Sequence, residues 1–319
     1  MTPLLRFTIR RLILTIPVIF AMSVFVFLLI RLVPGDPVRT MLGFRATDAN
    51  VAQIRGQLGL DRPLVAQYVS WVGNVFHGDL GTDFISKAPI TQLLSERLPV
   101  TLELTILAMG LALLIGIPLG VAAATGSKWT RRFTDGYVVA GVSIPDFWLG
   151  IMLVFVFSAT LGVLPPSGYS PFTSDPLANL RYLVLPVVTL AVGEGAYILR
   201  TTRGALESVL GQPFVGFLRA KGVTERRIVN RHGLRNAAAP IVTVVGIQFG
   251  VLLGGAIVIE TLFALPGVGR LLVTAISQRN YPVVQAGVLV VAALFIFVSL
   301  LTDLLLGWFD PRIADGQNS

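Results

Sequence analysis

The sequence predicts an all-α polytopic membrane protein with six transmembrane helices and an external insertion after the first of them. Of its 319 residues, 54% are hydrophobic and only 13% are charged, and the mean hydropathy of +0.78 is too high for a soluble domain. Several apolar runs reach the roughly 20 residues that a helix needs to cross a bilayer. Between two of these runs lies a strongly basic segment, which cannot lie in hydrocarbon.

The first predicted span covers residues 12–32 and follows three arginines, Arg6, Arg10 and Arg11. No small-residue cleavage site follows the run, so we interpret it as an uncleaved first helix rather than a signal peptide. The other predicted spans are residues 100–124, residues 137–161 with a bend at Pro145, residues 183–203, residues 241–263 and residues 284–308.

These spans divide the chain into four predicted regions. Residues 1–33 hold an N-terminal tail and the first span, and residues 34–98 form an external, periplasmic-side segment with short helices at residues 48–58 and 63–76. Residues 99–309 form a core of five membrane helices that includes a cytoplasmic loop at residues 205–239. Residues 310–319 form a cytoplasmic tail.

The distribution of basic residues predicts that both ends of the chain are cytoplasmic. About 15 of the 25 Lys and Arg residues fall on the predicted inner side, where short loops retain positive charge. Six of the remaining cations lie in the long external segment, whose charges influence topology less. The inverted orientation would place the most basic loop outside the cell.

The basic segment at residues 214–240 has the pattern of a helix, a break and a second helix. Good helix formers precede Gly222, which accepts the positive φ of a helix C-cap, and Thr224 is a candidate N-cap for the next helix. Pro240 is expected at the start of the following span, where its missing N–H costs little. Two short hinged helices indicate a docking surface. From charge alone, a loop that only fixes topology and touches lipid headgroups is the simpler alternative.

The motif Arg219-Ala220-Lys221-Gly222, followed by His232, Arg235-Asn236 and Pro240, resembles the loop by which permease subunits of ATP-binding-cassette importers contact their ATPases. Further matches follow in order along most of the chain: Arg-Leu-Val-Pro-Gly-Asp-Pro at residues 31–37, Gly254-Gly255-Ala256, Glu260-Thr261, residues 266–269 (Pro-Gly-Val-Gly), and Asp310-Pro311-Arg312. The chain is therefore similar to the dipeptide, oligopeptide and nickel permease family, and to the first of the two permease subunits of a dipeptide importer. Just before the motif, Phe217-Leu218 stands where the family has a small or polar residue followed by Ala. Two further positions depart from the family pattern: Asp83 stands where Ser is usual, and Asn280 where Asp is usual.

This resemblance implies the fold of a type I importer permease in the bacterial inner (plasma) membrane and a non-catalytic subunit without a cofactor. It also implies four kinds of partner: a second, related permease, two cytoplasmic ATPases, an external substrate-binding protein, and membrane lipid. The expected substrates are di- and oligopeptides, with nickel or haem as alternatives under the same mechanism. The expected ATPase-coupling residues are Arg219, Ala220, Lys221, Gly222, Arg227, His232 and Arg235.

Ionisable residues inside the spans are candidates for a substrate path, because charge in the membrane is costly unless it serves a function. They are Glu103, Asp146, Glu194 and Asp303, of which Asp146 and Glu194 lie deeper. As a hypothesis, the translocation path includes Asp146, Glu194, Gln248 and Gly254; the alternative for each is an internal ion pair or packing contact. Gly246, Gly250 and Gly254 share one helix face, which the family resemblance assigns to a subunit interface.

Several classes of function are excluded or disfavoured by what the sequence lacks. It has no Cys, its two His residues are far apart, and no aromatic-rich basic face indicates nucleic-acid binding. No GxxxxGK[ST], HExxH or GxSxG motif is present, so ATP must be hydrolysed by another polypeptide. A proton-coupled secondary transporter that titrates Asp146 and Glu194 is a weaker alternative because no internal repeat is evident. An intramembrane enzyme or assembly factor is weaker still.

Overall fold

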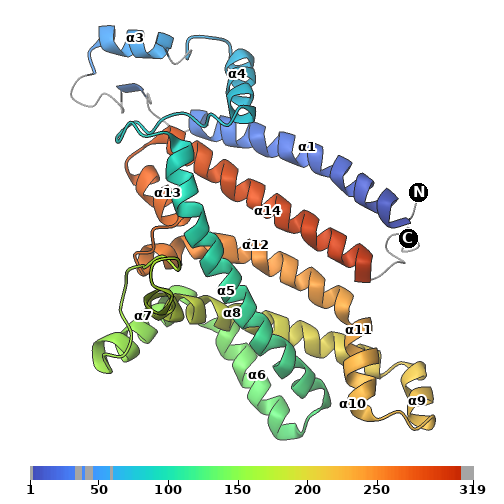
Figure 1. Ribbon diagram of the computed structural model, residues 1–319. Helices are drawn as coiled ribbons and strands as arrows, with labels where there is room; N and C mark the ends of the chain where they lie inside the picture. The colour runs from blue at the N-terminus through green and yellow to red at the C-terminus, as the bar shows by residue number, and fades with distance from the viewer. Residues whose placement is uncertain (1–2, 33–37, 40–45, 58–59, 310–319) are drawn as a thin grey trace.

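The computed structural model describes residues 3–32, 38–39, 46–57 and 60–309, and nearly all of them are helical (Figure 1). In chain order the helices are α1 (Pro3–Leu32), α3 (Asp48–Gln57), α4 (Leu64–Phe76), α5 (Ile90–Thr125), α6 (Lys128–Ser143), α7 (Asp146–Leu153), the π-helix η2 (Val154–Thr160), α8 (Pro176–Leu210), α9 (Pro213–Ala220), α10 (Glu225–Arg227), the π-helix η3 (Ile228–Gly233), α11 (Leu234–Asn236), α12 (Ala238–Leu262), α13 (Val268–Ser277) and α14 (Tyr281–Phe309).

Five of these helices, α1, α5, α8, α12 and α14, are long and apolar enough to cross a membrane, and the bent pair formed by α6 with α7 and η2 makes a sixth candidate. The predicted all-α fold with six spans is confirmed. The first turn of α1 and the last turn of α14 lie on the same side of the molecule as α9 and α10 (Figure 1). We call this side, which carries the basic segment, the basic end, and the other side the opposite end.

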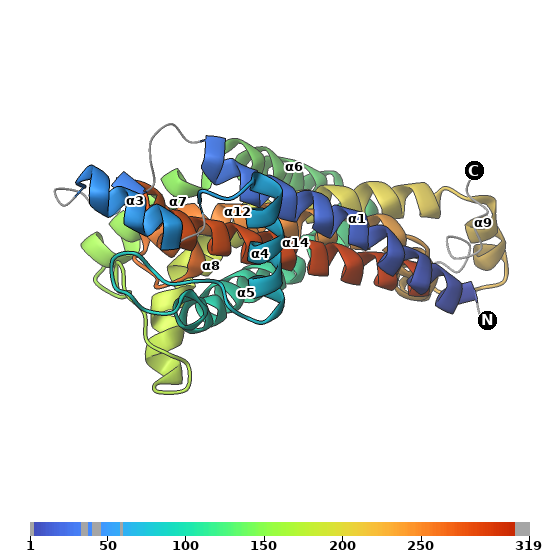
Figure 2. The same cartoon turned by 90° about the horizontal axis from the view of Figure 1, so that it is seen from above.

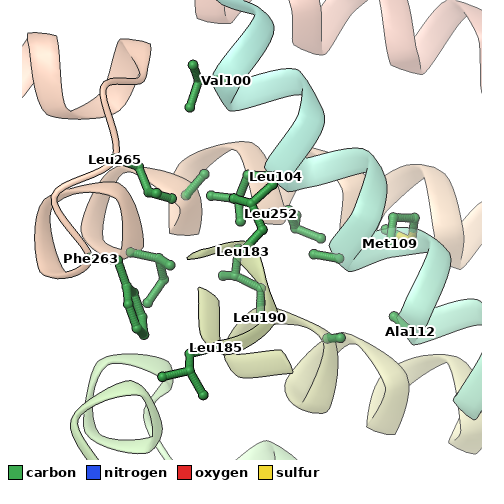
Figure 3. Packing of buried hydrophobic residues seen from close by; sticks show 14 of the residues in the cluster. Val100, Leu104, Met109, Ala112, Leu183, Leu185, Leu190, Leu252, Phe263 and Leu265 are labelled. Carbon is green, nitrogen blue, oxygen red and sulfur yellow. The ribbon is translucent and has the colours of Figure 1, made fainter. Parts of the chain in front are cut away.

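The centre of the molecule is the packing of α5 against α8. A Cβ atom on Gly116 would lie 2.8 Å from the carbonyl oxygen of Gly195, and one on Gly120 would lie 2.6 Å from Thr202 Cβ. Because these two glycines are four residues apart on one face of α5, they let the two helices approach closely. Apolar side chains from α5, α8 and α12, such as Leu104 and Leu190, complete the core (Figure 3).

The predicted third span differs from the single bent helix that was expected over residues 137–161. Instead α6 begins at Lys128 and ends at Ser143, and the chain turns by 102° before α7 and η2. Ile144 and Pro145 are both extended, with ψ of 120° and 136°. A residue before proline is driven out of the helical region, so Pro145 breaks the helix rather than only bending it.

At the opposite end, the chain between α12 and α14 forms a helix that the sequence analysis missed. Helix α13 contributes Leu272 and Ala275 to an apolar cluster with Ile90 and Leu94 of α5 and Val284 of α14. The helix is only 10 residues long, too short to give the sustained apolar run that marks a span. The sequence analysis therefore assigned no element between the spans at residues 241–263 and 284–308.

The other predicted helices are present in the structure. The two short helices predicted within residues 34–98 are α3 and α4. The boundaries of α12 and α14 lie within three residues of the predicted ones, whereas α5 begins 10 residues earlier than predicted and α8 extends seven residues further at each end. The turn at residues 33–37 and the tail at residues 310–319 lie outside the described residues.

Candidate functional site: the basic loop and the buried polar cluster

The basic loop has the predicted helix, break and helix, with Gly222 at the break. Its φ is +75°, in the left-handed region that side-chain-bearing residues enter only at a cost. The Gly222 N–H donates to the carbonyl of Arg219 at 2.9 Å, and the Val223 N–H donates to Leu218 at 3.1 Å. These bonds close the C-terminal turn of α9, so Gly222 is the αL residue that ends the helix.

An ion pair bridges the break. The Arg219 guanidinium donates to both carboxylate oxygens of Glu225, from Nε at 2.6 Å and from Nη2 at 3.3 Å. This hydrogen-bonded pairing raises the pKa of Arg219 and lowers the pKa of Glu225. Arg219 therefore braces α9 against α10, a role that the sequence analysis did not foresee. Lys221 places its Nζ 4.5 Å from the centroid of the Phe217 ring.

The second half of the loop is held to the membrane helices by its apolar side chains. Ile228 and Val229 are buried, and a Cβ on Gly233 would lie 2.7 Å from Leu206 Cδ1 of α8. Val215 of α9 is fully buried as well. One expectation was wrong: the Thr224 side chain makes no capping hydrogen bond. Its carbonyl instead accepts from the N–H groups of Arg227 and Ile228, at 2.9 Å each.

The loop residues predicted from the family resemblance lie mostly on its exposed face. His232 is half-buried, and its carbonyl accepts from Asn236 Nδ2 at 2.7 Å. The other six are exposed: Arg219, Ala220, Lys221, Gly222, Arg227 and Arg235. Buried apolar anchors beneath an exposed cationic face make this loop a surface that can receive a macromolecule and is fixed to α8 and α12.

Two of the predicted path residues form a buried pair. Gln248 Nε2 of α12 donates to Glu194 Oε2 of α8 at 2.7 Å, and both side chains are only 7% exposed. Asp146, at the start of α7, is partly exposed, and it approaches α8 at Gly193, the residue next to Glu194. The fourth, Gly254, lies apart from this group on an exposed part of α12, with no atom within 4 Å of the position that its Cβ would take.

The glycines on either side of Glu194 admit polar side chains to α8. Asp146 Oδ1 lies 3.3 Å from the position that a Cβ on Gly193 would occupy. The Tyr137 hydroxyl lies 2.9 Å from the equivalent position on Gly195 and donates to the carbonyl of Val192 at 3.1 Å. The two glycines therefore make room for the bent segment between α6 and α7 beside Glu194.

The glycine face of α12 is divided between two environments. A Cβ on Gly246 would lie 2.4 Å from the Thr302 side chain, and one on Gly250 would lie 2.4 Å from the Phe295 ring. Both partners belong to α14 of this chain, so two of the three glycines serve packing within the subunit rather than the expected subunit interface. Only Gly254 leaves its face of α12 uncovered.

A buried acid that the sequence analysis did not treat as a site is Glu260, near the end of α12. Its Oε1 accepts from Thr101 Oγ1 at 2.6 Å and its Oε2 from the Arg270 N–H at 3.0 Å. Thr101 Oγ1 in turn accepts from the Val268 N–H at 2.9 Å. The carboxylate thus ties α5, α12 and the first turn of α13 together. Its position inside an apolar run was a signal that could have identified it.

The two remaining acids of the predicted spans also have partners. Glu103 accepts from the Tyr169 hydroxyl at 2.8 Å, and burial together with this carboxylate raises the pKa of Tyr169 to about 12. Asp303 of α14 pairs with Arg11 of α1 at 2.9 Å. Each pair joins two separate segments, as the packing alternative expected.

The two departures from the family pattern lie in direct contact. Asn280 Nδ2, just before α14, donates to Asp83 Oδ1, which also accepts from the Ile85 N–H at 2.9 Å. Burial of Asp83 acts to raise its pKa, but hydrogen bonds from Ser86, Ile85 and Asn280 together lower it below the usual value. Asp83 and Asn280 therefore form a polar contact that holds one carboxylate and joins the segment before α5 to the start of α14.

Among the described residues, no group of three or more His, Cys, Asp and Glu side chains is arranged to hold a metal ion. The polar groups form two sites instead: the exposed basic loop at one end, and the Glu194–Gln248 pair with Asp146 among the membrane helices.

Comparison with known proteins identifies the family. Residues 116–315 match the family model described as binding-protein-dependent transport system inner membrane component, and residues 4–105 match the N-terminal model of such membrane components. The chain is 43% identical to a putative peptide transport system permease protein of Brucella abortus, over 93% of this chain and 95% of that protein. It is 40% identical to a glutathione transport system permease protein of Escherichia coli, over 97% and 99%.

Among solved structures, the chain resembles a subunit of the methionine ABC transporter in its inward-facing conformations. The TM-score is 0.58 at 20% identity, over 69% of this chain and 97% of that chain, and this likeness concerns the fold alone. The match confirms the fold expected for an importer permease. On these matches, the chain belongs to the family of binding-protein-dependent transport system inner membrane components.

Proposed function

We propose that this chain is one of two permease subunits of an ATP-driven importer of di- and oligopeptides, and that its basic loop receives the ATPases. The observation that carries the proposal is the connection of the loop: its buried anchors Val215, Ile228 and Val229 lie between the end of α8 and the start of α12. Those two helices carry Glu194 and Gln248. A force applied to the loop therefore reaches the buried polar pair.

The orientation of the chain follows from its charges. The exposed cations of the basic loop, with Arg131 and Arg203 nearby in α6 and α8, belong on the cytoplasmic side, where short basic loops are retained. This orientation places α3 and α4 outside the cytoplasm and the ends of α1 and α14 near the ATPases. It is the orientation in which an intracellular ATPase can reach Gly222.

The coupling mechanism is a mechanical one. Closure of two ATPases on ATP moves the exposed loop face, the Gly222 turn lets α9 move relative to α10, and the Arg219–Glu225 pair limits that movement. Because α8 and α12 are joined by the Glu194–Gln248 hydrogen bond, their displacement alters the contacts of that pair. Access to the translocation path then alternates between the two sides of the membrane.

The assembly requires further chains. We propose a second, related permease packed against the uncovered Gly254 face of α12, two cytoplasmic ATPases on the basic loops, and a substrate-binding protein at the opposite end. The chain itself would be non-catalytic, and membrane lipid would cover its apolar outer faces.

Peptides are the favoured substrates because relatives at about 40% identity over nearly the whole chain are named as peptide and glutathione permeases. The carboxylates of Glu194 and Asp146 suit the free amino terminus of a peptide. Nickel and haem are alternatives that require the same mechanism, and a proton-coupled secondary transporter is a weaker one.

The experiment that tests the function is uptake of labelled dipeptide, oligopeptide and nickel by cells with and without the gene. Loss of peptide uptake alone is the expected result. Loss of nickel uptake alone would retain the mechanism and refute the peptide substrate. Peptide uptake that persists after removal of ATP but collapses with the proton gradient would refute the ATP-driven mechanism.

A further inference from the structure

Helix α4 in the external segment carries a wider apolar surface than the rest of the chain covers. On a helical projection its apolar positions fall into two adjoining stripes, and its polar positions fill the remaining arc. The first stripe is Leu64, Tyr68, Trp71 and Val75; the second is Val65, Val69, Val72 and Phe76; the polar face is Ala66, Gln67, Ser70, Gly73 and Asn74.

The first stripe packs on α1. The Tyr68 ring lies 5.2 Å from that of Phe27 and 6.3 Å from that of Phe20, centroid to centroid, and the Tyr68 hydroxyl hydrogen bonds Ser23 Oγ at 2.7 Å. Trp71 adds a ring contact with Phe27 at 5.8 Å. Most of the second stripe is left outside this contact: Val65, Val69 and Phe76 are 74%, 62% and 86% exposed, while Val72 is half-buried.

The contacts on α1 place α4 at membrane depth. The apolar span of α1 is Thr8–Leu28, so Phe20, Ser23 and Phe27 all lie within it. At 1.5 Å per residue, Ser23 is about 8 Å and Phe27 about 14 Å from the middle of the span. Half of a hydrocarbon core is about 15 Å, so α4 lies against the outer half of the bilayer near its boundary.

The direction and composition of α4 fit that position. In both views α4 runs across α1 rather than along it (Figures 1 and 2), which sets it in the plane of the membrane. It contains no Asp, Glu, Lys or Arg, and the nearest charged residues in the sequence are Arg62 and Asp79, beyond its two ends. Tyr and Trp on an amphipathic helix are typical of the membrane interface.

We propose that α4 is an interfacial anchor whose second stripe, Val65, Val69, Val72 and Phe76, inserts into the acyl chains of the outer leaflet. Lipid is the occupant because the stripe continues the exposed apolar face of α1, on which Ile16 is 64% and Phe20 is 61% exposed. The polar face with Ser70 and Asn74 then points to water. The external segment is thereby fixed at a set height above the membrane.

The experiment uses the absence of Cys from the chain, which permits single-site spin labelling of the full-length protein. Val69→Cys tests the stripe, the adjacent Ser70→Cys is the matched control on the polar face, and Ile16→Cys on α1 is the lipid reference. Labelled chains are reconstituted in phosphatidylethanolamine–phosphatidylglycerol vesicles, alone and with the subunits that co-purify. Collision rates with oxygen, which concentrates in lipid, are compared with those of a water-soluble nickel chelate.

The proposal predicts an oxygen-to-nickel collision ratio at Val69→Cys that exceeds the ratio at Ser70→Cys several-fold and lies below the ratio at Ile16→Cys, which is close to the middle of the span. Equal ratios at Val69→Cys and Ser70→Cys would place the stripe in water and overturn the proposal. A label at Val69→Cys that is immobilised and shielded from both reagents would overturn it in favour of a protein occupant. Shielding that appears only when the substrate-binding protein is added would identify that occupant. Val65→Cys repeats the test if Val69→Cys does not fold.

Discussion

Gln248 on α12 donates a 2.7 Å hydrogen bond to Glu194 on α8, joining the two long helices that lead into and out of the basic loop. Both side chains are buried, so each depends on the other for hydrogen bonding. In the proposed mechanism, movement of the loop reaches the membrane-buried part of the chain through this pair.

Removing the donor should destabilise the protein more than changing the acceptor. Gln248→Ala leaves the buried Glu194 carboxyl without this hydrogen bond, which costs about 1–3 kcal/mol, whereas Glu194→Gln retains a hydrogen-bonding pair. Thermal unfolding of the purified complex in detergent measures the difference, with the exposed Gln278→Ala as control. Equal stability of Gln248→Ala and Gln278→Ala would show that the pair contributes nothing.

Glu194 also makes a prediction about selectivity. If its carboxylate complements the amino terminus of a peptide, Glu194→Gln should reduce uptake of cationic peptides more than uptake of neutral ones. Labelled peptides of matched length test this in cells that express comparable amounts of the variant. Unchanged transport of both kinds of peptide would remove Glu194 from the path.

Charge exchange at the Arg219–Glu225 pair distinguishes two roles of Arg219: bracing α9 against α10, or contacting the ATPases directly. Because the pair is exposed to solvent, the single change Arg219→Glu should have little effect on the thermal stability of the protein, yet it should weaken retention of the ATPases. The exchange Arg219→Glu with Glu225→Arg restores the pair with reversed polarity. Recovery of ATPase co-purification in the double variant would assign Arg219 a bracing role, and no recovery would assign it a direct contact.

The Asp83–Asn280 contact predicts a compensated substitution. Asn280→Asp alone sets two carboxylates against each other and should destabilise the protein at pH 7, while Asp83→Ser added to it should restore stability. Acidification toward pH 5 should reduce the defect of Asn280→Asp, because repulsion raises the pKa of one carboxyl until it protonates. Thermal stability measured across this pH range provides the test, and a defect that stays constant with pH would argue against charge repulsion.

The native contact has the opposite pH dependence. The pKa of Asp83 is lowered in the folded protein, so its contribution is present above the unfolded value of about 3.9 and is lost as pH falls through the folded pKa below it. Between pH 5 and pH 8 the wild-type protein should therefore show no change in stability from Asp83.

The contacts of Glu260 predict that Gly267→Ala is the most destabilising of the substitutions considered. A Cβ on Gly267 would lie 2.2 Å from Glu260 Cδ, so Gly267→Ala must displace a carboxylate that holds α5, α12 and α13 together. We expect a loss of about 2 kcal/mol or more and low yield of folded protein. Gly204→Ala on α8, where the new methyl meets no atom within 4 Å, is the control. Equal yields would contradict the proposed tie.

The spans and the break at Gly222 were predictable because they rest on local signals: apolar length, basic flanks and a helix-ending glycine. The 102° turn at Pro145 was recognised only as a bend, since its size depends on how α7 packs against α8 and α12. The helix α13 was missed because its apolar face is too short to be read without the cluster around Leu272.

In the candidate sites too, single residues could be predicted from local sequence signals, but contacts between distant residues could not. Glu194 and Gln248 are 54 residues apart, and composition alone could nominate each of them but could not join them. Asp83 and Asn280 looked like two unrelated departures until folding brought them into contact. Close glycines were predicted on α12, but the close backbone approach of α5 to α8 at Gly116 and Gly120 was not, because a glycine spacing does not reveal which helix will face it.

The proposed coupling through the Gly222 turn is tested most directly by one measurement: the number of peptides transported per ATP hydrolysed by the reconstituted complex carrying Gly222→Pro. Proline fixes φ near −65°, which is incompatible with the +75° found at this turn. Gly216→Ala, at an open helical position in α9, is the matched control. With Gly222→Pro, we expect that the ATPases still co-purify and hydrolyse ATP while peptide transport falls at least tenfold. With Gly216→Ala, we expect normal transport. Normal coupled transport by Gly222→Pro would contradict the proposed coupling.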